Sequence, residues 1–129
     1  MSPRIVLIDD ETNLRQNMTD ILETAGYVVF GAADADAGLA LIRDTNPDAI
    51  LCDVALPGND GFYVLEQVGQ LARVVPFIFV TARVENSDFR KGMALGADDY
   101  LFKPFTGEEL LTAIQARLDK YRRILGRHT

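Results

Sequence analysis

The chain has 129 residues, 48% of them hydrophobic and 25% charged, and its formal net charge is −6. A chain of this length and composition is expected to form one globular domain whose core needs no disulfides, which excludes a disulfide-stapled miniprotein and a low-complexity chain. The negative charge disfavours unaided binding to nucleic acid or to an anionic membrane, and it favours small cations and basic partners.

Two features predict the compartment. Cys52 is the only cysteine and cannot form an internal disulfide, which indicates a reducing environment. The first apolar run, residues 5–8, is too short for the apolar region of a signal peptide or for a membrane span. The sequence therefore predicts a cytoplasmic protein.

Five short apolar or β-branched runs alternate with helical patterns along the chain. Such runs, bounded by turn residues, are typical of strands that are buried on both faces of a parallel sheet. We predict strands at residues 4–8, 27–30, 49–52, 76–80 and 100–102. The alternation favours an α/β fold in which five helices cover both faces of a doubly wound sheet, and it does not give the order of the strands.

The first two predicted helices each show an apolar stripe at helical spacing. The stripes consist of Leu14, Met18, Ile21 and Leu22, and of Ala35, Leu39 and Ile42. Thr12 and Asp34 stand where N-caps are expected, because a side-chain oxygen there can accept a hydrogen bond from the first turn. Gly26 follows the first pattern directly, as a C-terminal cap does.

The third and fourth helices are shorter. Their apolar positions are Phe62, Leu65 and Val68, and then Phe89, Met93 and Ala94. Gly96 is the expected cap of the fourth helix. Gly92 lies inside that helix, where glycine costs about 1 kcal/mol relative to alanine, so we expect a weak element that is easily biased.

The last helix is predicted from Glu108 to about Leu125. It opens with two acids and closes with Arg122 and Arg123, which complements the helix dipole. Its apolar residues follow a heptad-like spacing at Leu111, Ile114, Leu118, Tyr121 and Leu125. Two interpretations stay open: the first half packs on the sheet and the rest frays, or the helix continues into a dimerising or connecting coiled coil.

Residues that can carry chemistry follow four of the predicted strands. Asp9 and Asp10 follow the first strand, Asp53 the third, Thr81 the fourth and Lys103 the fifth. In an open α/β sheet, ligands bind outside the carboxyl ends of the strands. We therefore expect three acids, one hydroxyl and one ammonium to meet at one edge of the sheet.

Three converging carboxylates need a compensating cation. Two carboxylates 5 Å apart repel each other by about 3 kcal/mol at an effective dielectric constant near 20. Oxygen ligands without histidine or cysteine favour Mg²⁺, which recruits phosphate oxygens, and an aspartate can itself be the nucleophile in phosphoryl transfer. With Mg²⁺ and Lys103 neutralising the transferring group, Asp53 is predicted to accept a phosphoryl group.

These residues make the chain resemble the receiver domains of response regulators in two-component signalling. The signature comprises Asp9-Asp10, Asp53 with Leu56-Pro57 and Gly61, Thr81-Ala82, and the run GADDYLFKPF at residues 96–105. The resemblance covers residues 4 to about 122. It implies a flavodoxin-like fold with strand order 2-1-3-4-5, a receiver domain at residues 1–122, and a tail at 123–129 that extends the last helix.

The resemblance also implies roles for the metal site. Asp10 and Asp53 would bind Mg²⁺ directly, the backbone carbonyl of Ala55 would add a ligand, and Asp9 would act through water. Lys103 would contact the phosphoryl group.

The resemblance further implies a switch. Thr81 would bond a phosphoryl oxygen and move towards it, and Tyr100 would rotate inward into the space that Thr81 leaves. Pro104 matches a position that is cis in the family. The phosphodonor would be a sensor histidine kinase or a histidine phosphotransfer protein. We expect the readout on the face of the fourth helix, fifth strand and fifth helix.

Ala55 and Arg83 each stand two residues after a site residue, where side chains could control a hydrolytic water. Our hypothesis is that Arg83 shields or pairs with the phosphoryl group and slows its loss. The alternative is that Arg83 is a solvated loop charge.

Three functions compete. The first is a signalling switch that catalyses only its own phosphorylation and dephosphorylation, as a stand-alone receiver or as the amino-terminal part of a longer regulator, with a possible homodimer through the last helix or the readout face. The second is an aspartate-nucleophile phosphatase, which usually has a second acid where Ala55 stands. The third is a docking-only pseudo-receiver. A nucleotide- or flavin-binding fold is disfavoured because both glycine-rich phosphate motifs are missing.

The remaining residues of note have simple interpretations. We predict that Phe62, Phe77, Phe79 and Phe102 are core residues. Cys52 is predicted to be a small buried hydrophobe. His128 is predicted to be a solvated side chain in the tail.

Overall fold

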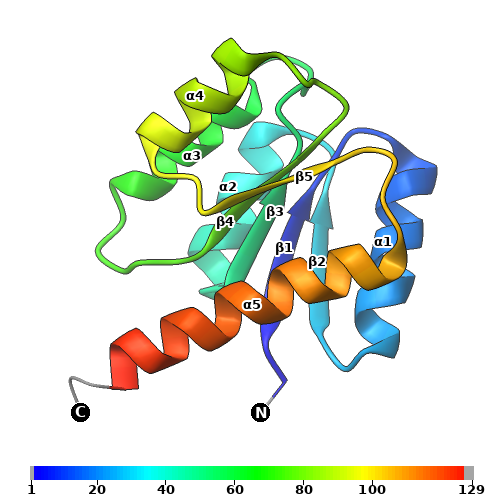
Figure 1. Cartoon of the computed structure of the whole chain (residues 1–129), viewed down its shortest axis with the longest axis vertical. Coiled ribbons are helices and arrows are strands. Elements are labelled where there is room, and N and C mark those ends of the chain that lie inside the picture. The colour runs from blue at the N-terminus through cyan, green and yellow to red at the C-terminus, as the bar shows by residue number, and fades with distance from the viewer. Residues whose placement is uncertain (1, 127–129) are drawn as a thin grey trace.

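A computed structural model describes residues 2–126. Five strands and five helices alternate along the chain (Figure 1). They are β1 Arg4–Ile8, α1 Thr12–Thr24, β2 Val28–Ala32, α2 Ala35–Thr45, β3 Ala49–Cys52, α3 Gly61–Gly69, β4 Phe77–Thr81, α4 Asn86–Leu95, β5 Asp99–Phe102 and α5 Gly107–Gly126. The strands form one parallel sheet in the order β2-β1-β3-β4-β5, which confirms the predicted fold.

The sheet lies between two layers of helices, each with its own core. Alternate residues of β1 separate the layers: Ile5 and Leu7 pack with α1 and α5, whereas Val6 and Ile8 pack with α2 and α3. Figure 1 shows α1 and α5 on one face of the sheet and α2, α3 and α4 on the other. The central strands β1, β3 and β4 are buried on both faces, as their continuous apolar runs predict.

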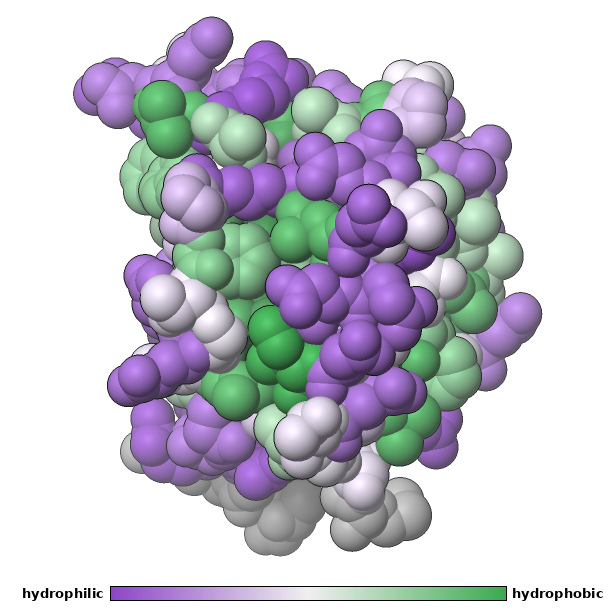
Figure 2. All heavy atoms as spheres, turned by 90° about the vertical axis from the view of Figure 1, so that its right-hand side faces the viewer, coloured by the Kyte–Doolittle hydropathy of each residue, from purple (hydrophilic) through white to green (hydrophobic). Residues whose placement is uncertain are grey.

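Figure 2 shows the side of the molecule that carries α1 and β2. Hydrophilic side chains cover most of this side, with apolar side chains between them. No helix within residues 2–126 is long and apolar enough to cross a membrane.

Two strands begin and end later than predicted. β2 ends at Ala32 rather than at residue 30, because Gly31 and Ala32 continue the ladder with Leu7 and Ile8 of β1. β4 ends at Thr81, which pairs with Phe102 of β5. Thr81 is therefore the last residue of a buried strand rather than the first residue of a loop.

The helix caps agree with the sequence in part. Asp34 is the N-cap of α2, and its carboxylate accepts a hydrogen bond from the Ala37 N–H at 2.8 Å. The prediction for Thr12 was wrong, because Glu11 is the extended N-cap residue and Thr12 is already helical. Gly96 caps α4 with a φ of 105°, a left-handed conformation that glycine adopts without strain.

The surface at α4 and β5 differs from the prediction. Phe89 and Met93 are 42% and 43% exposed, so the predicted apolar face of α4 is open to solvent, and Gly92 is the buried residue of this helix. Phe102 is 39% exposed and is not a core residue, because it lies on the edge strand β5. Phe62, Phe77, Phe79 and Cys52 are buried as predicted.

α5 starts with a reciprocal capping box that we did not predict. The Thr106 N–H donates to Glu109 Oε1 at 2.9 Å, and the Glu109 N–H donates to Thr106 Oγ1 at 3.0 Å.

The apolar stripe of α5 is only partly buried: Ile114 and Leu118 are buried against the sheet, whereas Leu125 is 55% exposed. The first part of the stripe thus packs on the sheet, and a coiled coil beyond it stays a prediction, as does the domain boundary at residue 122. His128 lies outside the described residues.

The two interpretations of α5 predict different results for two matched leucine substitutions. We expect Leu118→Ala to lower the free energy of unfolding by about 2–5 kcal/mol, because it leaves a cavity in the core. Leu125→Ala should change it by less than about 0.5 kcal/mol. Urea unfolding at two protein concentrations measures both. A large, concentration-dependent loss for Leu125→Ala would instead support a dimeric coiled coil.

Candidate functional site

The predicted site residues lie together at the carboxyl edge of the sheet. Ile8 of β1 is in register with Cys52 of β3, so the residues that follow them, Asp9 and Asp53, stand side by side. The Asp53 N–H donates to the Ile8 carbonyl at 2.9 Å and continues the ladder into the site. The parallel register therefore brings together two acids that are 44 residues apart in the chain.

The three acids form one cluster. Asp9, Asp10 and Asp53 each offer a carboxylate oxygen, and these oxygens all lie within 4.8 Å of one another. Asp9 and Asp53 are only 1% and 5% exposed, whereas Asp10 faces solvent. Buried carboxylates need a compensating charge, and a set of oxygen donors suits Mg²⁺. The cluster fits the predicted metal site.

Lys103 supplies one compensating charge. Its Nζ donates to Asp53 Oδ2 at 2.8 Å and to Asp9 Oδ2 at 3.0 Å. Burial lowers the pKa of the Lys103 ammonium, but the contacts with Asp53 and Asp9 outweigh burial and the pKa is raised overall. Lys103 therefore stays charged at neutral pH and bridges the acids.

Asp9 is the most constrained acid. Burial raises the pKa of its carboxyl above the usual value, and hydrogen bonds from the Glu11 N–H and Lys103 offset this only in part. Burial thus makes the ionised form of Asp9 costly, and the Lys103 ammonium offsets part of that cost.

The turn after Asp53 is built for close approach. A Cβ on Gly61 would lie 2.2 Å from the Asp53 carbonyl oxygen, so a side chain there would push the turn away from the site. Gly58 has a φ of 74°, and Asp60 caps α3 by accepting the Tyr63 N–H at 3.0 Å. Asp53 Oδ1 accepts a hydrogen bond from the Ala55 N–H at 3.2 Å.

Thr81 ends β4, which lies on the other side of β3 from β1, and Arg83 follows two residues later. Thr81 is fully buried, and its Oγ1 accepts the Arg83 N–H at 3.1 Å. The Arg83 guanidinium points to α4, where its Nε lies 2.9 Å from Asp88 Oδ2. Ala82 is exposed. Arg83 is therefore paired with Asp88 rather than with the acidic cluster.

Tyr100 is packed inward beside the site. It is 9% exposed, and its hydroxyl donates to the Asp88 carbonyl at 2.9 Å. A Cβ on Gly92 would lie 1.9 Å from the Tyr100 hydroxyl oxygen. Gly92 therefore has a packing role that the sequence did not reveal, since the pattern indicated only a weak helix.

The peptide bond between Lys103 and Pro104 is cis, as the resemblance implies.

Two residues of the site were missed by sequence reasoning. Asp88 contacts both Arg83 and Tyr100, and Arg15 donates to the Asp9 carbonyl at 2.7 Å. Both are charged residues within predicted helical segments, where a solvated charge is the usual interpretation.

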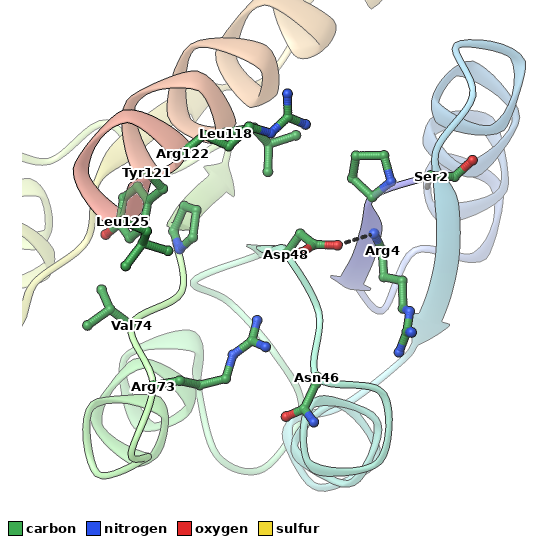
Figure 3. Close-up of a pocket in the computed structure, with 12 residues that line it drawn as sticks. Ser2, Arg4, Asn46, Asp48, Arg73, Val74, Leu118, Tyr121, Arg122 and Leu125 are labelled. Carbon is green, nitrogen blue, oxygen red and sulfur yellow. Dashed lines mark hydrogen bonds between the residues drawn. The ribbon is translucent and has the colours of Figure 1, made fainter. Parts of the chain in front are cut away.

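A cavity of about 470 Å³ lies at the other end of the sheet, far from the acids. Its lining includes Arg4, Asp48, Arg73 and Tyr121, and the Arg4 N–H donates to Asp48 Oδ2 at 2.7 Å (Figure 3). The predicted site residues do not line this cavity. The candidate site is therefore identified by the chemistry of the acidic cluster and Lys103, and not by the volume of a cavity.

The model of the response regulator receiver domain matches residues 5–115. The chain belongs to this family. This receiver domain is 35% identical to the transcriptional regulatory protein BaeR of Escherichia coli, over 91% of this chain and 48% of that protein. It therefore spans about half the length of this relative.

Solved structures of receiver domains superpose closely. The CheY-like response regulator receiver domain protein from Methanospirillum hungatei has a TM-score of 0.92 and 32% identity, over 95% of this chain and 98% of that one. The chemotaxis response regulator CheY4 of Vibrio cholerae has a TM-score of 0.85 and 30% identity, over 90% and 98% of the two chains. The chain is thus a receiver domain of the two-component response regulator type.

The raised pKa of Asp9 predicts how stability depends on pH without divalent ions. A carboxyl whose pKa is higher in the folded state makes the fold less stable as pH rises above the unfolded value of 3.8. We expect Asp9→Asn to raise the urea midpoint at pH 7 in EDTA. The gain should shrink as pH falls towards 3.8.

Added Mg²⁺ provides the control for this prediction. Mg²⁺ should stabilise the parent receiver more than it stabilises Asp9→Asn, because ligands stabilise the state that binds them. A lower midpoint for Asp9→Asn at pH 7 in EDTA would contradict the prediction.

Proposed function

We propose that this receiver is a phosphorylation-dependent switch that accepts a phosphoryl group on Asp53 with the help of Mg²⁺. The observation that supports this most is the cluster of Asp9, Asp10 and Asp53 bridged by Lys103. The cluster offers a carboxylate nucleophile, oxygen ligands for a hard cation, and a fixed ammonium. These are the parts that phosphoryl transfer to an aspartate requires.

The residues present suit the metal. Asp10 and Asp53 would bind Mg²⁺ directly together with the Ala55 carbonyl oxygen, and Asp9 would act through water. When bound, Mg²⁺ supplies positive charge that offsets the charge developing on the phosphoryl oxygens.

Asp53 is the nucleophile in this proposal. A carboxylate oxygen of Asp53 attacks the phosphorus of a phosphohistidine, a P–O bond forms, the P–N bond breaks, and the electron pair leaves with the imidazole. Lys103, already 2.8 Å from Asp53 Oδ2, holds positive charge beside the reacting oxygens. Thr81 Oγ1 accepts the Arg83 N–H, so its own hydrogen is available for a phosphoryl oxygen.

The response is proposed to travel from Thr81 to α4. Movement of Thr81 towards the phosphoryl group would change the space beside Tyr100, whose hydroxyl holds the Asp88 carbonyl in the first turn of α4. The Tyr100 ring contacts the half-exposed rings of Phe89 and Phe102, with centroid distances of 4.9 and 5.8 Å. We therefore propose that the face of α4, β5 and α5 is the readout surface.

The proposed partners follow from the family. A sensor histidine kinase or a histidine phosphotransfer protein would supply the phosphoryl group in the cytoplasm. BaeR is a transcriptional regulator, and we propose that the output of this receiver passes to a separate module or protein, with a homodimer through α5 or the readout surface as one route.

Labelling by acetyl phosphate and Mg²⁺ tests the proposed function. We expect one phosphoryl group per parent molecule, retained on Asp53, and no labelling of Asp53→Asn or of the parent in EDTA. Intact-mass spectrometry measures the label, and phosphate release measures turnover. Fast multiple turnover would indicate a phosphatase, and an unlabelled parent would indicate a docking-only module.

The proposed role of Arg83 has its own test. The Arg83 guanidinium would have to leave Asp88 to shield the phosphoryl group, and in that case Arg83→Ala shortens the lifetime of the phosphoryl group several-fold, because water then reaches the phosphorus more easily. Arg90→Ala, at an exposed position of α4, is the matched control and should leave the lifetime unchanged. Decay of label after removal of the donor measures both. An unchanged lifetime for Arg83→Ala would refute the role.

A further inference from the structure

Arg15 reaches from α1 to the backbone of the acidic loop. It is half-buried, and its Nη1 donates to the Asp9 carbonyl at 2.7 Å. Within residues 2–126, Arg15 forms no salt bridge, although three carboxylates lie in the same loop cluster. Its hydrogen bond therefore fixes a peptide group rather than neutralising an acid.

The edge strand β2 leaves room for this side chain. A Cβ on Gly31 would lie 3.3 Å from Arg15 Cδ, which is tighter than an ordinary contact. Gly31 is exposed and in register with Leu7 of β1. The aliphatic part of Arg15 thus lies across the one residue of β2 that has no side chain.

Arg15 completes the bonding of Asp9. The Asp9 N–H donates to the Ala32 carbonyl at 3.0 Å, and the two carboxylate oxygens accept from the Glu11 N–H and Lys103. The carbonyl is the remaining polar group of Asp9, and Arg15 is its partner.

That carbonyl belongs to the peptide unit that joins Asp9 to Asp10. Because a peptide unit is planar, fixing its oxygen also fixes the positions of the Asp10 nitrogen and Cα, from which the Asp10 side chain starts. The Asp10 carboxylate accepts no hydrogen bond from any residue that the structure describes. Within residues 2–126, the position of this carboxylate near the other two acids therefore rests on the backbone that carries it and on its own rotamer, without a side-chain partner to hold it.

We propose that Arg15 is a positioning residue for the divalent cation, which acts by orienting the Asp9–Asp10 peptide so that the Asp10 carboxylate faces Asp53. The inference rests on the proposed function of the acidic cluster as a Mg²⁺ site. Arg15 and Gly31 form one device: the arginine holds the peptide, and the glycine makes room for the arginine.

Electrostatics and positioning predict opposite signs. If Arg15 acted only as a nearby positive charge, its removal would strengthen Mg²⁺ binding, because like charges repel. If it positions Asp10, its removal weakens Mg²⁺ binding. The direction of the change therefore decides between a bystander charge and a positioning role.

The test is a Mg²⁺ titration of the unphosphorylated protein, followed by the amide resonances of the loop, with urea unfolding in EDTA as a check on folding. We expect Arg15→Ala to weaken Mg²⁺ binding about tenfold, the usual effect of removing a residue that orients a metal ligand. Arg15→Lys, which keeps the charge but loses the guanidinium, should also bind more weakly than the parent.

Gly31→Val separates positioning from general stability. Valine is favoured in strands, so the variant should be no less stable than the parent, yet its side chain displaces Arg15 and should weaken Mg²⁺ binding. Arg43→Ala is the control: Arg43 is exposed in the last turn of α2, at the other end of the sheet, and its removal should leave the affinity unchanged.

The outcomes separate the two proposals. Unchanged or tighter Mg²⁺ binding by Arg15→Ala, with normal binding by the parent, would overturn the role of Arg15 and leave the acidic site intact. If the parent binds no Mg²⁺, or if Asp53→Asn binds Mg²⁺ with the same affinity as the parent, both the proposed metal site and the role of Arg15 are overturned.

Discussion

The bridge from Lys103 to two buried carboxylates is the interaction on which the site depends. Asp9 and Asp53 follow the neighbouring strands β1 and β3, whereas Lys103 follows β5 at the edge of the sheet. Two buried acids without a cation would be costly. The ammonium reaches them only when β4 and β5 have assembled beside β3. The charge balance of the site is therefore tied to the completed fold.

Two glycines, which have no side chain, allow the close packing at the site. Gly61 lets the turn after Asp53 close against the Asp53 carbonyl, and Gly92 lets the Tyr100 hydroxyl pack on α4. Both contacts are shorter than any Cβ would allow. Glycine thus serves both the loop after Asp53 and the proposed switch, in each case through close approach of two elements.

Tyr100 connects the interior of this receiver to its surface. Its ring packs against the buried Phe79 and against the half-exposed Phe89 and Phe102. Its hydroxyl donates to the backbone carbonyl of Asp88. The Asp88 side chain in turn pairs with Arg83, which stands two residues after Thr81. A movement of Thr81 could therefore be transmitted through Tyr100 to the exposed apolar surface at Phe89 and Phe102 by a few direct contacts. That arrangement is the physical basis for the proposed readout.

The sequence by itself determined the alternation of strands and helices and the positions of Asp53 and Lys103, because apolar runs and strand-end residues are local patterns. Its resemblance to a known family added the strand order. Only the tertiary structure decided what lies against what. It showed that Gly92 makes room for a tyrosine and that Phe102 is exposed on an edge strand. It also showed that the Arg15 guanidinium donates a hydrogen bond to the Asp9 carbonyl. Such contacts join residues far apart in the chain or depend on the path of the backbone, and no local pattern encodes them.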